Sequence, residues 1–274
     1  MTTIVLDDTT QYIECPHCLG PIDVHTVVST PIPPPRYTQK PHLSIVCITR
    51  GDPHAAAFIS SMRDAATSLN AEFVIGADGY NAFVIAQDYS DITVSVQSSG
   101  YVESVLNKVI LAANGIWILR LDDDEEISPA LFAFLRDRRY TTNPLWRIPT
   151  MALWGDTSHY ITNPPLFPDA HLRLTTWKYR GGWADAVHAP APHQTDNIAP
   201  AAILHHKYLL KSLPERQRVA ARYEQLKPGG GYGVHAPFTI PEVIFGDKLT
   251  TAPVGDGSTP TASTTSSPPP APTL

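Results

Sequence analysis

The segment from Ile116 to Glu126, IWILRLDDDEE, changes abruptly from apolar residues to five consecutive acids. Its apolar half predicts a short strand buried in a sheet. In open α/β sheets, ligands bind at the edge where the carboxyl ends of the strands lie. Neighbouring aspartates repel one another, so this run favours a bound cation or many hydrogen-bond donors. The alternative is a solvated acidic turn before a helix, since Ser128-Pro129 is a good helix start.

The composition narrows the class of protein. The chain has 274 residues, of which 43% are hydrophobic, enough for one sizeable core. A net charge of −6 argues against nucleic acid as a partner. No segment has the roughly 18 to 20 continuous apolar residues of a membrane span, and the N-terminus lacks the pattern of a secretory signal. We therefore expect a soluble cytoplasmic protein.

The distribution of proline predicts the domain organisation. Residues 1–28 form a small N-terminal segment, and residues 29–41 form a proline-rich, extended linker. The main domain is expected over residues 42–247. Residues 248–274 are rich in Pro, Thr, Ser and Ala with little apolar bulk, which predicts a disordered tail.

The N-terminal segment contains the sequence CPHC. Cys15 and Cys18 have the spacing of one zinc knuckle, and a Zn²⁺ ion there would need further ligands such as His17 or His25. The CxxC spacing also occurs in redox motifs, and a segment without metal is the third interpretation. Cys47 falls within a predicted strand and is expected in the core.

Strands and helices alternate in the main domain. Strands are predicted over 43–49, 72–77, 92–96 and 116–121, and helices are predicted from Asp52-Pro53 to 69, over 101–114 and over 128–139. This alternation predicts βαβ units and a mostly parallel central sheet flanked by helices. Further strands are expected over 145–154, 171–177, 184–188 and 201–208, followed by a helix from a Ser212–Glu215 capping box to about 226.

This order of features resembles the GT-A fold nucleotide-sugar glycosyltransferases, most closely family 2. The matching segments are LSIVCITRGD (43–52), EFVIGADG (72–79), LDDDEE (121–126), HLRL (171–174), AVH (186–188) and ILHH (203–206). LDDDEE resembles the DXD motif of that family. The resemblance covers roughly residues 42–228, and the ordered series is more specific than any single motif.

The resemblance implies a Rossmann-like α/β fold of the GT-A type and a glycosyltransferase of the hexosyltransferase kind. Such an enzyme moves a sugar from a nucleotide-diphosphate donor, here expected to be a UDP-sugar, to a hydroxyl of a saccharide or protein acceptor, with inversion. The expected cofactor is Mn²⁺ or Mg²⁺, which would neutralise the diphosphate leaving group. The alternatives are a degenerate domain that binds nucleotide or glycan without turnover, and a nucleotidyltransferase.

The resemblance also implies roles for individual residues. The expected metal ligands are Asp122, Asp124 and His205, and the expected donor-binding residues are Thr49, Arg50, Asp78, Asn107 and Asp122. Asp123 is expected to face the other way, because alternate residues of an extended chain point to opposite sides. For His205 the other interpretation is a hydrogen-bonded strand histidine. His206 is the alternative ligand, although it is expected to face the opposite side of the strand.

The general base is harder to assign. Family members that carry a VHE element have a glutamate where this chain has Ala189, and the RLF phenylalanine is replaced by Thr175. The candidates for the base are therefore Asp185, Asp169 and His188. Of the aromatic residues in this half, one or two are expected to line an acceptor groove: Trp154, Tyr160, Trp177, Tyr179 and Trp183.

Overall fold

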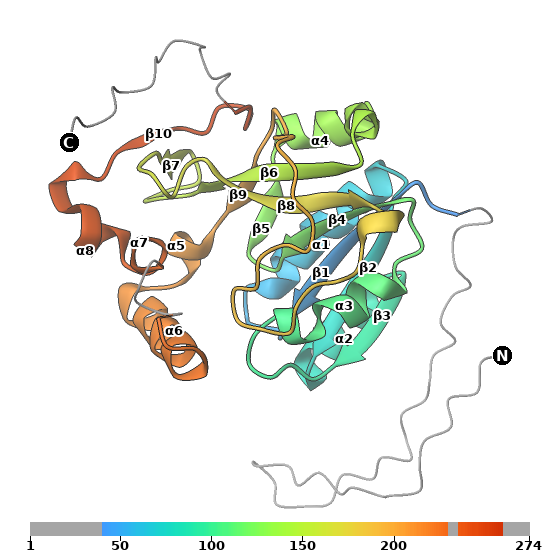
Figure 1. The fold of residues 1–274 in the computed structure, drawn as a ribbon, viewed down its shortest axis with the longest axis horizontal. Coiled ribbons are helices and arrows are strands. Elements are labelled where there is room, and N and C mark those ends of the chain that lie inside the picture. The colour runs from blue at the N-terminus through green and yellow to red at the C-terminus, as the bar shows by residue number, and fades with distance from the viewer. Residues whose placement is uncertain (1–39, 230–234, 260–274) are drawn as a thin grey trace, which may run out of the picture. The chain divides into compact units, whose positions relative to one another are not determined.

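The computed structural model describes residues 40–229 and 235–259 (Figure 1). The predicted CPHC segment with Cys15 and Cys18, its linker up to residue 39 and the tail from residue 260 lie outside the described residues. In the described part of the chain, no helix is both long and apolar enough to cross a membrane.

The first half of the domain is built from βα units. Four parallel strands lie side by side in the order β3-β2-β1-β4. Their bounds are β1 (Leu43–Thr49), β2 (Glu72–Asp78), β3 (Ile92–Val96) and β4 (Trp117–Asp122). The connecting helices are α1 (Ala55–Ser68), α2 (Tyr80–Tyr89) and α3 (Glu103–Ala112).

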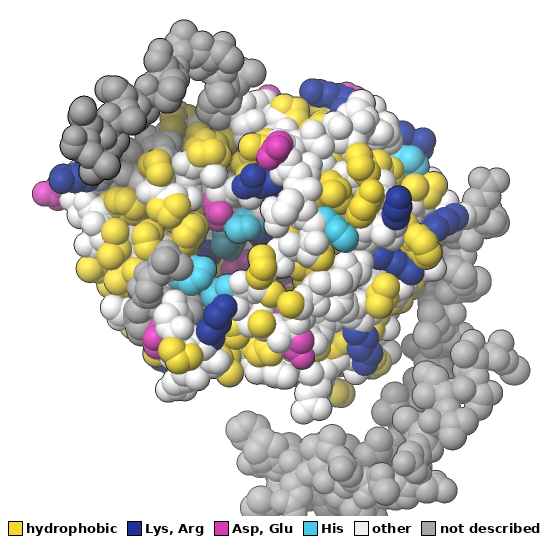
Figure 2. Space-filling model, in the orientation of Figure 1, with side chains coloured by type: hydrophobic (Ala, Val, Ile, Leu, Met, Phe, Trp, Pro, Cys, Tyr) yellow, Lys and Arg dark blue, Asp and Glu magenta, His cyan; other side chains and the backbone are white. Residues whose placement is uncertain are grey.

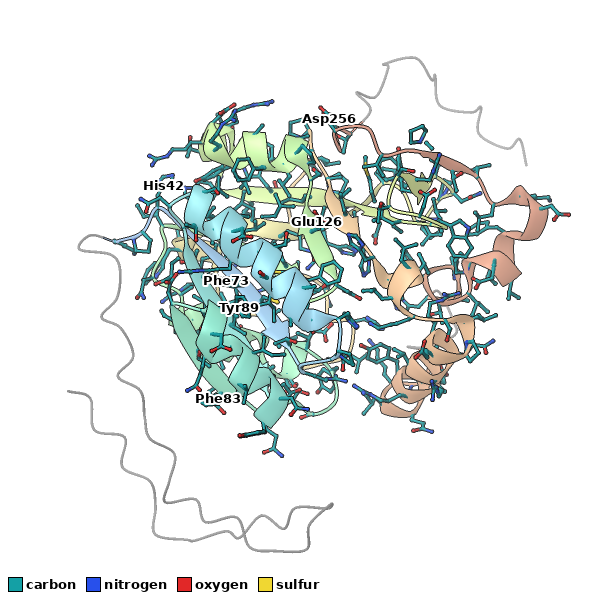
Figure 3. The ribbon with its side chains drawn as sticks, turned by 180° about the vertical axis from the view of Figure 1, so that it is seen from behind. His42, Phe73, Phe83, Tyr89, Glu126 and Asp256 are labelled. Atoms are coloured by element: carbon teal, nitrogen blue, oxygen red, sulfur yellow. The ribbon has the colours of Figure 1, made fainter. Side chains whose placement is uncertain are left out.

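The continuous apolar strands are buried because helices cover both faces of this half-sheet. Alternate residues such as Ile45 and Phe73 pack against α1 and α2, while Val46 and Val74 pack against α3. Figure 3 shows Phe73 on the side of the sheet that α1 and α2 cover. All four parallel strands consequently end at one edge of the sheet, which is where the acidic run begins.

The second half completes a mixed sheet of eight strands in the order β3-β2-β1-β4-β8-β6-β9-β5. The added strands are β5 (Glu125–Ile127), β6 (Leu145–Ala152), β8 (Asp169–Thr176) and β9 (Ile203–His205). Strand β8 runs antiparallel to both β4 and β6, and β5 runs antiparallel to β9. The predicted α/β architecture, with parallel strands of a central sheet flanked by helices, is confirmed.

The remaining elements surround the second half of the sheet. The helices are α4 (Pro129–Arg136), α5 (Lys207–Leu210), α6 (Leu213–Leu226), α7 (Ala236–Thr239) and α8 (Pro241–Phe245), with short 3₁₀ turns at Arg139–Thr142, Trp177–Tyr179 and Gly246–Lys248. Strand β7 (His159–Ile161) pairs with β10 (Thr251–Pro253) in a separate two-stranded sheet. The capping box of Ser212 and Glu215 begins α6 as predicted.

Several local predictions differ from the structure. Helix α2 was not predicted, because YNAFVIAQDY mixes helix-favouring and strand-favouring residues and follows Gly79 rather than a capping side chain. Helix α1 begins at Ala55 after His54, so Asp52-Pro53 forms the preceding turn instead of the cap. The strand predicted over 184–188 is wrong: these residues form turns, and His188 has a φ of 52°. Strand β10 also lies beyond residue 247, where we expected the tail to begin.

Candidate active site

The acidic run turns from β4 into β5, and its carboxylates point to different partners. Asp122 closes β4, Asp123 and Asp124 form the turn, and Glu125 opens β5. Asp123 accepts a hydrogen bond of 2.7 Å from the hydroxyl of Thr49, at the end of β1. The three aspartates are thereby separated rather than gathered around one point, which limits the repulsion among them.

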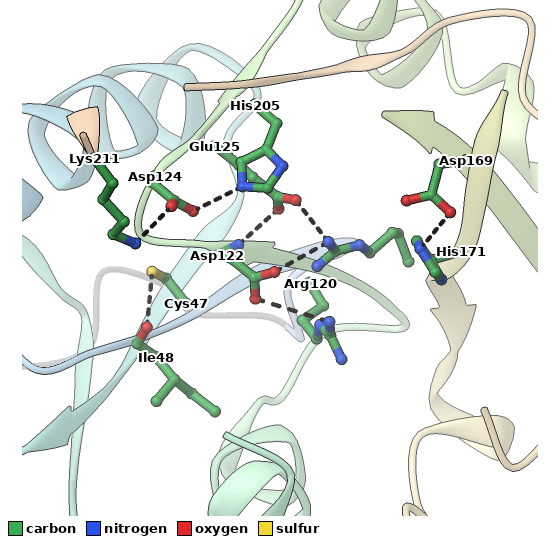
Figure 4. Close-up of polar contacts among 11 residues, drawn as sticks. Cys47, Ile48, Arg120, Asp122, Asp124, Glu125, Asp169, His171, His205 and Lys211 are labelled. Atoms are coloured by element: carbon green, nitrogen blue, oxygen red, sulfur yellow. Dashed lines mark hydrogen bonds and ion pairs between the residues drawn. The ribbon is translucent and has the colours of Figure 1, made fainter. Parts of the chain in front are cut away.

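Asp124 is buried and faces the imidazole of His205 and the ammonium group of Lys211 (Figure 4). Its Oδ1 lies 3.3 Å from Nε2 of His205, and its Oδ2 lies 3.2 Å from Nζ of Lys211. Burial alone would raise the pKa of Asp124, but His205 and Lys211 hold it well below its usual range. In return, Asp124 raises the pKa of His205 against the effect of burial.

Asp122 and Glu125 share the guanidinium of Arg173 on β8. Arg173 Nη2 donates to Asp122 Oδ2 at 3.1 Å and to Glu125 Oε1 at 2.6 Å. Desolvation would raise the pKa of Asp122, yet Arg173 and Arg120 lower it to about 2. For Glu125 burial prevails over Arg173, and its pKa is raised. Nε and Nη1 of Arg173 are buried and have no protein partner.

A cavity of about 470 Å³ lies beside this cluster. Its walls include Asp122, Glu125, Arg173 and His205 from the acidic side, and Asp169, His171, His188, Ala189, Lys207 and His235 from the other elements. In the space-filling view, histidine side chains gather around a hollow in this face, and acidic side chains are visible within it (Figure 2). The cavity has the location expected for a ligand at the carboxyl ends of β1 and β4.

The C-terminal helices add positive charge next to the cavity. Lys207 Nζ donates to the backbone oxygen of Phe238 at 2.6 Å, and its pKa is lowered to about 8, because desolvation outweighs the attraction of Asp124. Lys211 and Arg216 line a smaller adjoining pocket together with Lys207. Three cationic side chains from residues 207–216, the segment after β9, thus lie next to the cavity.

The residues predicted to bind the donor lie at the predicted edge but are engaged with the protein. Asp78 accepts hydrogen bonds from Ser98 N and Oγ at 3.0 and 2.5 Å, and its Oδ2 lies 3.6 Å from Nε of Arg50. Asn107 uses both ends of its amide on the backbone of Trp183, at 2.5 and 3.1 Å. The two hydrogen bonds of Asn107 therefore hold the backbone of Trp183 against α3.

The three predicted base candidates lie in different surroundings. Asp185 is exposed, accepts a hydrogen bond of 2.8 Å from Tyr101 and is not among the residues that line the cavity. His188 lines the cavity with its ring stacked on His235 at 4.2 Å. Asp169 lines the cavity and pairs with His171 at 2.8 Å. Ala189, at the position where the resemblance predicts an acid, is also part of the wall.

The three predicted metal ligands do not converge as a set. In the part of the chain that the structure describes, no three carboxylate, imidazole or thiolate groups gather around a common point. Asp124 Oδ1 and His205 Nε2 do approach to 3.3 Å, which suits two ligands of one cation with bonds of about 2.1 Å. Magnesium-type sites commonly use one or two protein ligands and complete the shell with water and substrate phosphates. Asp122 is held by Arg173, and a cation bound by Asp124 and His205 would share the Asp124 carboxylate with Lys211.

The sequence analysis did not identify three residues of the site, which are His171, Arg173 and Lys211. The first two belong to the segment HLRL, where they alternate in sequence with Asp169. The period of two in that segment could have indicated a common face. Lys211 had no such signal, because it reaches Asp124 only through the short helix α5 that follows β9.

No family model matches the sequence, and no curated protein matches it. Among solved structures, the fold is similar to a fragment of S. aureus TarS, at 10% identity and a TM-score of 0.42, covering 68% of this chain and 66% of that one. A TarS fragment in complex with UDP-GlcNAc gives 13% identity and a TM-score of 0.43, covering 68% and 67%. A longer TarS structure is covered over only 40% of its length, at 12% identity and a TM-score of 0.39. The chain spans about two thirds of the TarS fragments, and at these identities the likeness concerns the fold alone.

Proposed function

We propose that this chain is a glycosyltransferase that uses a nucleotide-diphosphate sugar, with a UDP-sugar as the first candidate. The observation that carries the proposal is the pair Asp124 and His205, 3.3 Å apart, at the carboxyl end of β4 and next to a cavity of about 470 Å³. A carboxylate and an imidazole at the ligand-binding edge of an α/β sheet suit a divalent cation and the diphosphate it would accompany.

On the donor side, one pair of side chains would bind a cation, and cationic side chains would bind the phosphate oxygens. Asp124 and His205 would hold Mn²⁺ or Mg²⁺, which supplies positive charge opposite the diphosphate leaving group when bound. Arg173 presents buried N–H groups without a protein partner, and Lys207 and Lys211 lie next to the same acidic turn. These groups would bind phosphate oxygens and help the nucleoside diphosphate to leave.

The sugar would then lie in the cavity between this donor side and the wall formed by β8 and the 188 segment. A single displacement at the anomeric carbon inverts its configuration and needs a base on the acceptor side. The acceptor would be a saccharide or a protein hydroxyl. Of the aromatic side chains proposed to line an acceptor groove, Trp183 belongs to the cavity wall.

The test is binding followed by turnover. We expect UDP-GlcNAc, UDP-glucose or another member of a panel of UDP-, GDP- and TDP-sugars to raise the melting temperature in the presence of Mn²⁺, and the same donor to release free nucleoside diphosphate. Asp124→Asn should abolish the Mn²⁺-dependent part of the shift while circular dichroism shows an intact fold. A wild-type protein that neither binds nor cleaves any donor of the panel would disprove the proposal.

A degenerate domain that binds without turnover is the second candidate, favoured by Ala189 in the cavity wall. It predicts the same Mn²⁺-dependent binding and the same effect of Asp124→Asn. It differs in turnover, because no nucleoside diphosphate would be released, either to water or to any saccharide tested. Quantifying UDP in the binding reactions after prolonged incubation separates the two candidates.

A further inference from the structure

Strand β8 contributes three charged or titratable side chains to the wall of the 470 Å³ cavity. They are Asp169, His171 and Arg173, and the pairing of β8 with β6 shifts register next to Arg173. The Arg173 end is fixed to Asp122 and Glu125 by its guanidinium. The other end carries the contact between Asp169 Oδ1 and His171 Nε2, at 2.8 Å (Figure 4).

The spacing of these side chains suits the two sides of a sugar-transfer reaction. Two residues along a strand span about 7 Å, so the backbone at His171 lies roughly that far from the backbone at Arg173. Arg173 contacts Asp122 and so lies on the side where the diphosphate would bind. His171 is two residues away along the strand. A sugar bound beside Arg173 would lie in the same cavity as the imidazole of His171.

The contact with Asp169 assigns different tasks to the two ring nitrogens. With the proton on Nε2 donated to the carboxylate, Nδ1 carries the lone pair and can accept a proton. The side chain of His171 is 57% exposed and lines the cavity. The carboxylate stabilises the imidazolium that forms when Nδ1 is protonated.

We propose that His171 is the general base of the transfer reaction and that Asp169 is its positioning residue; this assignment rests on the proposed function. The acceptor oxygen forms a bond to the anomeric carbon as the bond from that carbon to the diphosphate oxygen breaks. The hydroxyl proton moves to Nδ1 of His171, and the bonding electron pair leaves with the nucleoside diphosphate. No oxidant or further reactant is needed.

The other groups of the cavity are less suited to this role. The ring of His188 packs between His235 and Tyr223, with centroids 4.2 and 5.0 Å away. Glu103 accepts a hydrogen bond from the backbone nitrogen of His188 at 3.2 Å. Ala189 has no titratable group, and Asp169 and His171 line the same cavity.

The chain contains a matched control for this pair. His159 and Asp156 also form a contact of 3.0 Å between an imidazole and a carboxylate, with side chains 46% and 58% exposed. Neither residue lines the cavity. A substitution at His159 removes the same type of contact between an imidazole and a carboxylate at a place that does not line the cavity.

The experiment uses water as the acceptor, so no natural acceptor has to be known. The full chain is incubated with Mn²⁺ and the sugar nucleotide of the panel that raises the melting temperature most. Release of the nucleoside diphosphate gives kcat, and titration calorimetry gives the Kd of the donor. His171→Ala should lower kcat by about 100-fold or more with Kd within about twofold, and added imidazole should restore part of the loss. His159→Ala should leave both values unchanged.

The role of Asp169 is tested in the same assay. Asp169→Asn should lower kcat by about tenfold, Asp169→Glu should recover part of that loss, and Asp169→Asn should cost nothing further in the His171→Ala background. Unchanged kcat in His171→Ala, or a loss that imidazole does not restore, would overturn the assignment while leaving the proposed function intact. A wild type that binds donors without releasing nucleoside diphosphate would also overturn it, and a wild type that binds none would overturn the proposed function as well.

Discussion

The hydroxyl of Thr49 at the end of β1 donates a 2.7 Å hydrogen bond to Asp123 Oδ2, and thereby turns the central aspartate of the acidic run away from its two neighbours. Burial is the main reason why the pKa of Asp123 is raised to about 6, and the bond from Thr49 opposes this effect. A carboxyl group whose pKa is higher in the folded state stabilises the fold below its unfolded pKa of about 3.9. That contribution is lost as the pH rises through about 6.

Asp123→Asn should therefore raise the free energy of unfolding at pH 8 by about 1 to 2 kcal/mol and leave it nearly unchanged at pH 4. Urea unfolding at both pH values, in EDTA so that no cation contributes, measures the difference. Thr49→Val is the control with the opposite sign, because it removes the hydrogen bond that favours the carboxylate. A gain for Asp123→Asn of equal size at pH 4 and pH 8 would contradict this account.

The adjacent histidines His205 and His206 should differ sharply in their effect on a bound cation. His205 Nε2 lies 3.3 Å from Asp124, whereas His206 Nε2 lies 3.1 Å from Glu126 and its ring packs on Phe58. His205→Asn should weaken Mn²⁺ binding in the presence of UDP by at least about 10- to 100-fold. His206→Asn should leave it within about twofold, as titration calorimetry would show. Equal losses of Mn²⁺ affinity in the two variants would show that His205 has no special role in binding the cation.

Substitution of Arg173 should lower the free energy of unfolding strongly, because two carboxylates share its guanidinium. Arg173→Met leaves Asp122 and Glu125 without their shared cation, and breaking a buried ion pair costs about 3 to 5 kcal/mol. Arg173→Lys should recover only part of this loss, because an ammonium group lacks the planar fork of N–H donors. Urea unfolding at pH 7 gives the values.

The matched control for Arg173 is Arg63, which pairs with Asp91 at 2.8 and 3.0 Å far from the cavity. Arg63→Met should also lower the free energy of unfolding, but should leave the Kd of the donor unchanged under conditions where the protein is folded. Arg173→Met should weaken donor binding as well. If the two variants had the same effect on the donor Kd, Arg173 would be a structural residue only.

The strands of the first half were predictable because β1, β2 and β4 are mainly apolar and β3 alternates apolar residues with Thr93 and Ser95. Their parallel order places Thr49, Asp78 and Asp122 at the same edge of the sheet. The contacts of these residues were not predictable in the same way. Asn107 was expected to meet the donor, yet its amide is used on the backbone of Trp183, a segment that follows many residues later. Hydrogen bonds between such distant residues depend on how the second half of the chain packs on the first, and no local sequence pattern predicts that packing.

Gly115 follows directly after the helix predicted over 101–114, but in the structure α3 ends at Ala112 and Gly115 lies against β1, where its backbone nitrogen donates to Ser44 Oγ. A Cβ atom at this position would lie 2.5 Å from Ser44 Oγ, 2.6 Å from Ser44 N and 2.6 Å from Trp117 O. Two of these three are backbone atoms of paired strands, so the structure has little room to relax.

Gly115→Ala should accordingly lower the free energy of unfolding by at least about 2 kcal/mol, because the added methyl group forces β1 and β4 apart at their start. Gly181→Ala is the control, since a Cβ there meets no atom within 4 Å, and it should change stability by less than about 0.5 kcal/mol. Thermal and urea unfolding of both variants measure the difference. Because the strain lies at the amino ends of the strands, remote from the acidic turn, Gly115→Ala should keep the donor Kd of the wild type at temperatures where it remains folded. A stability equal to that of Gly181→Ala would show that Gly115 has no steric role.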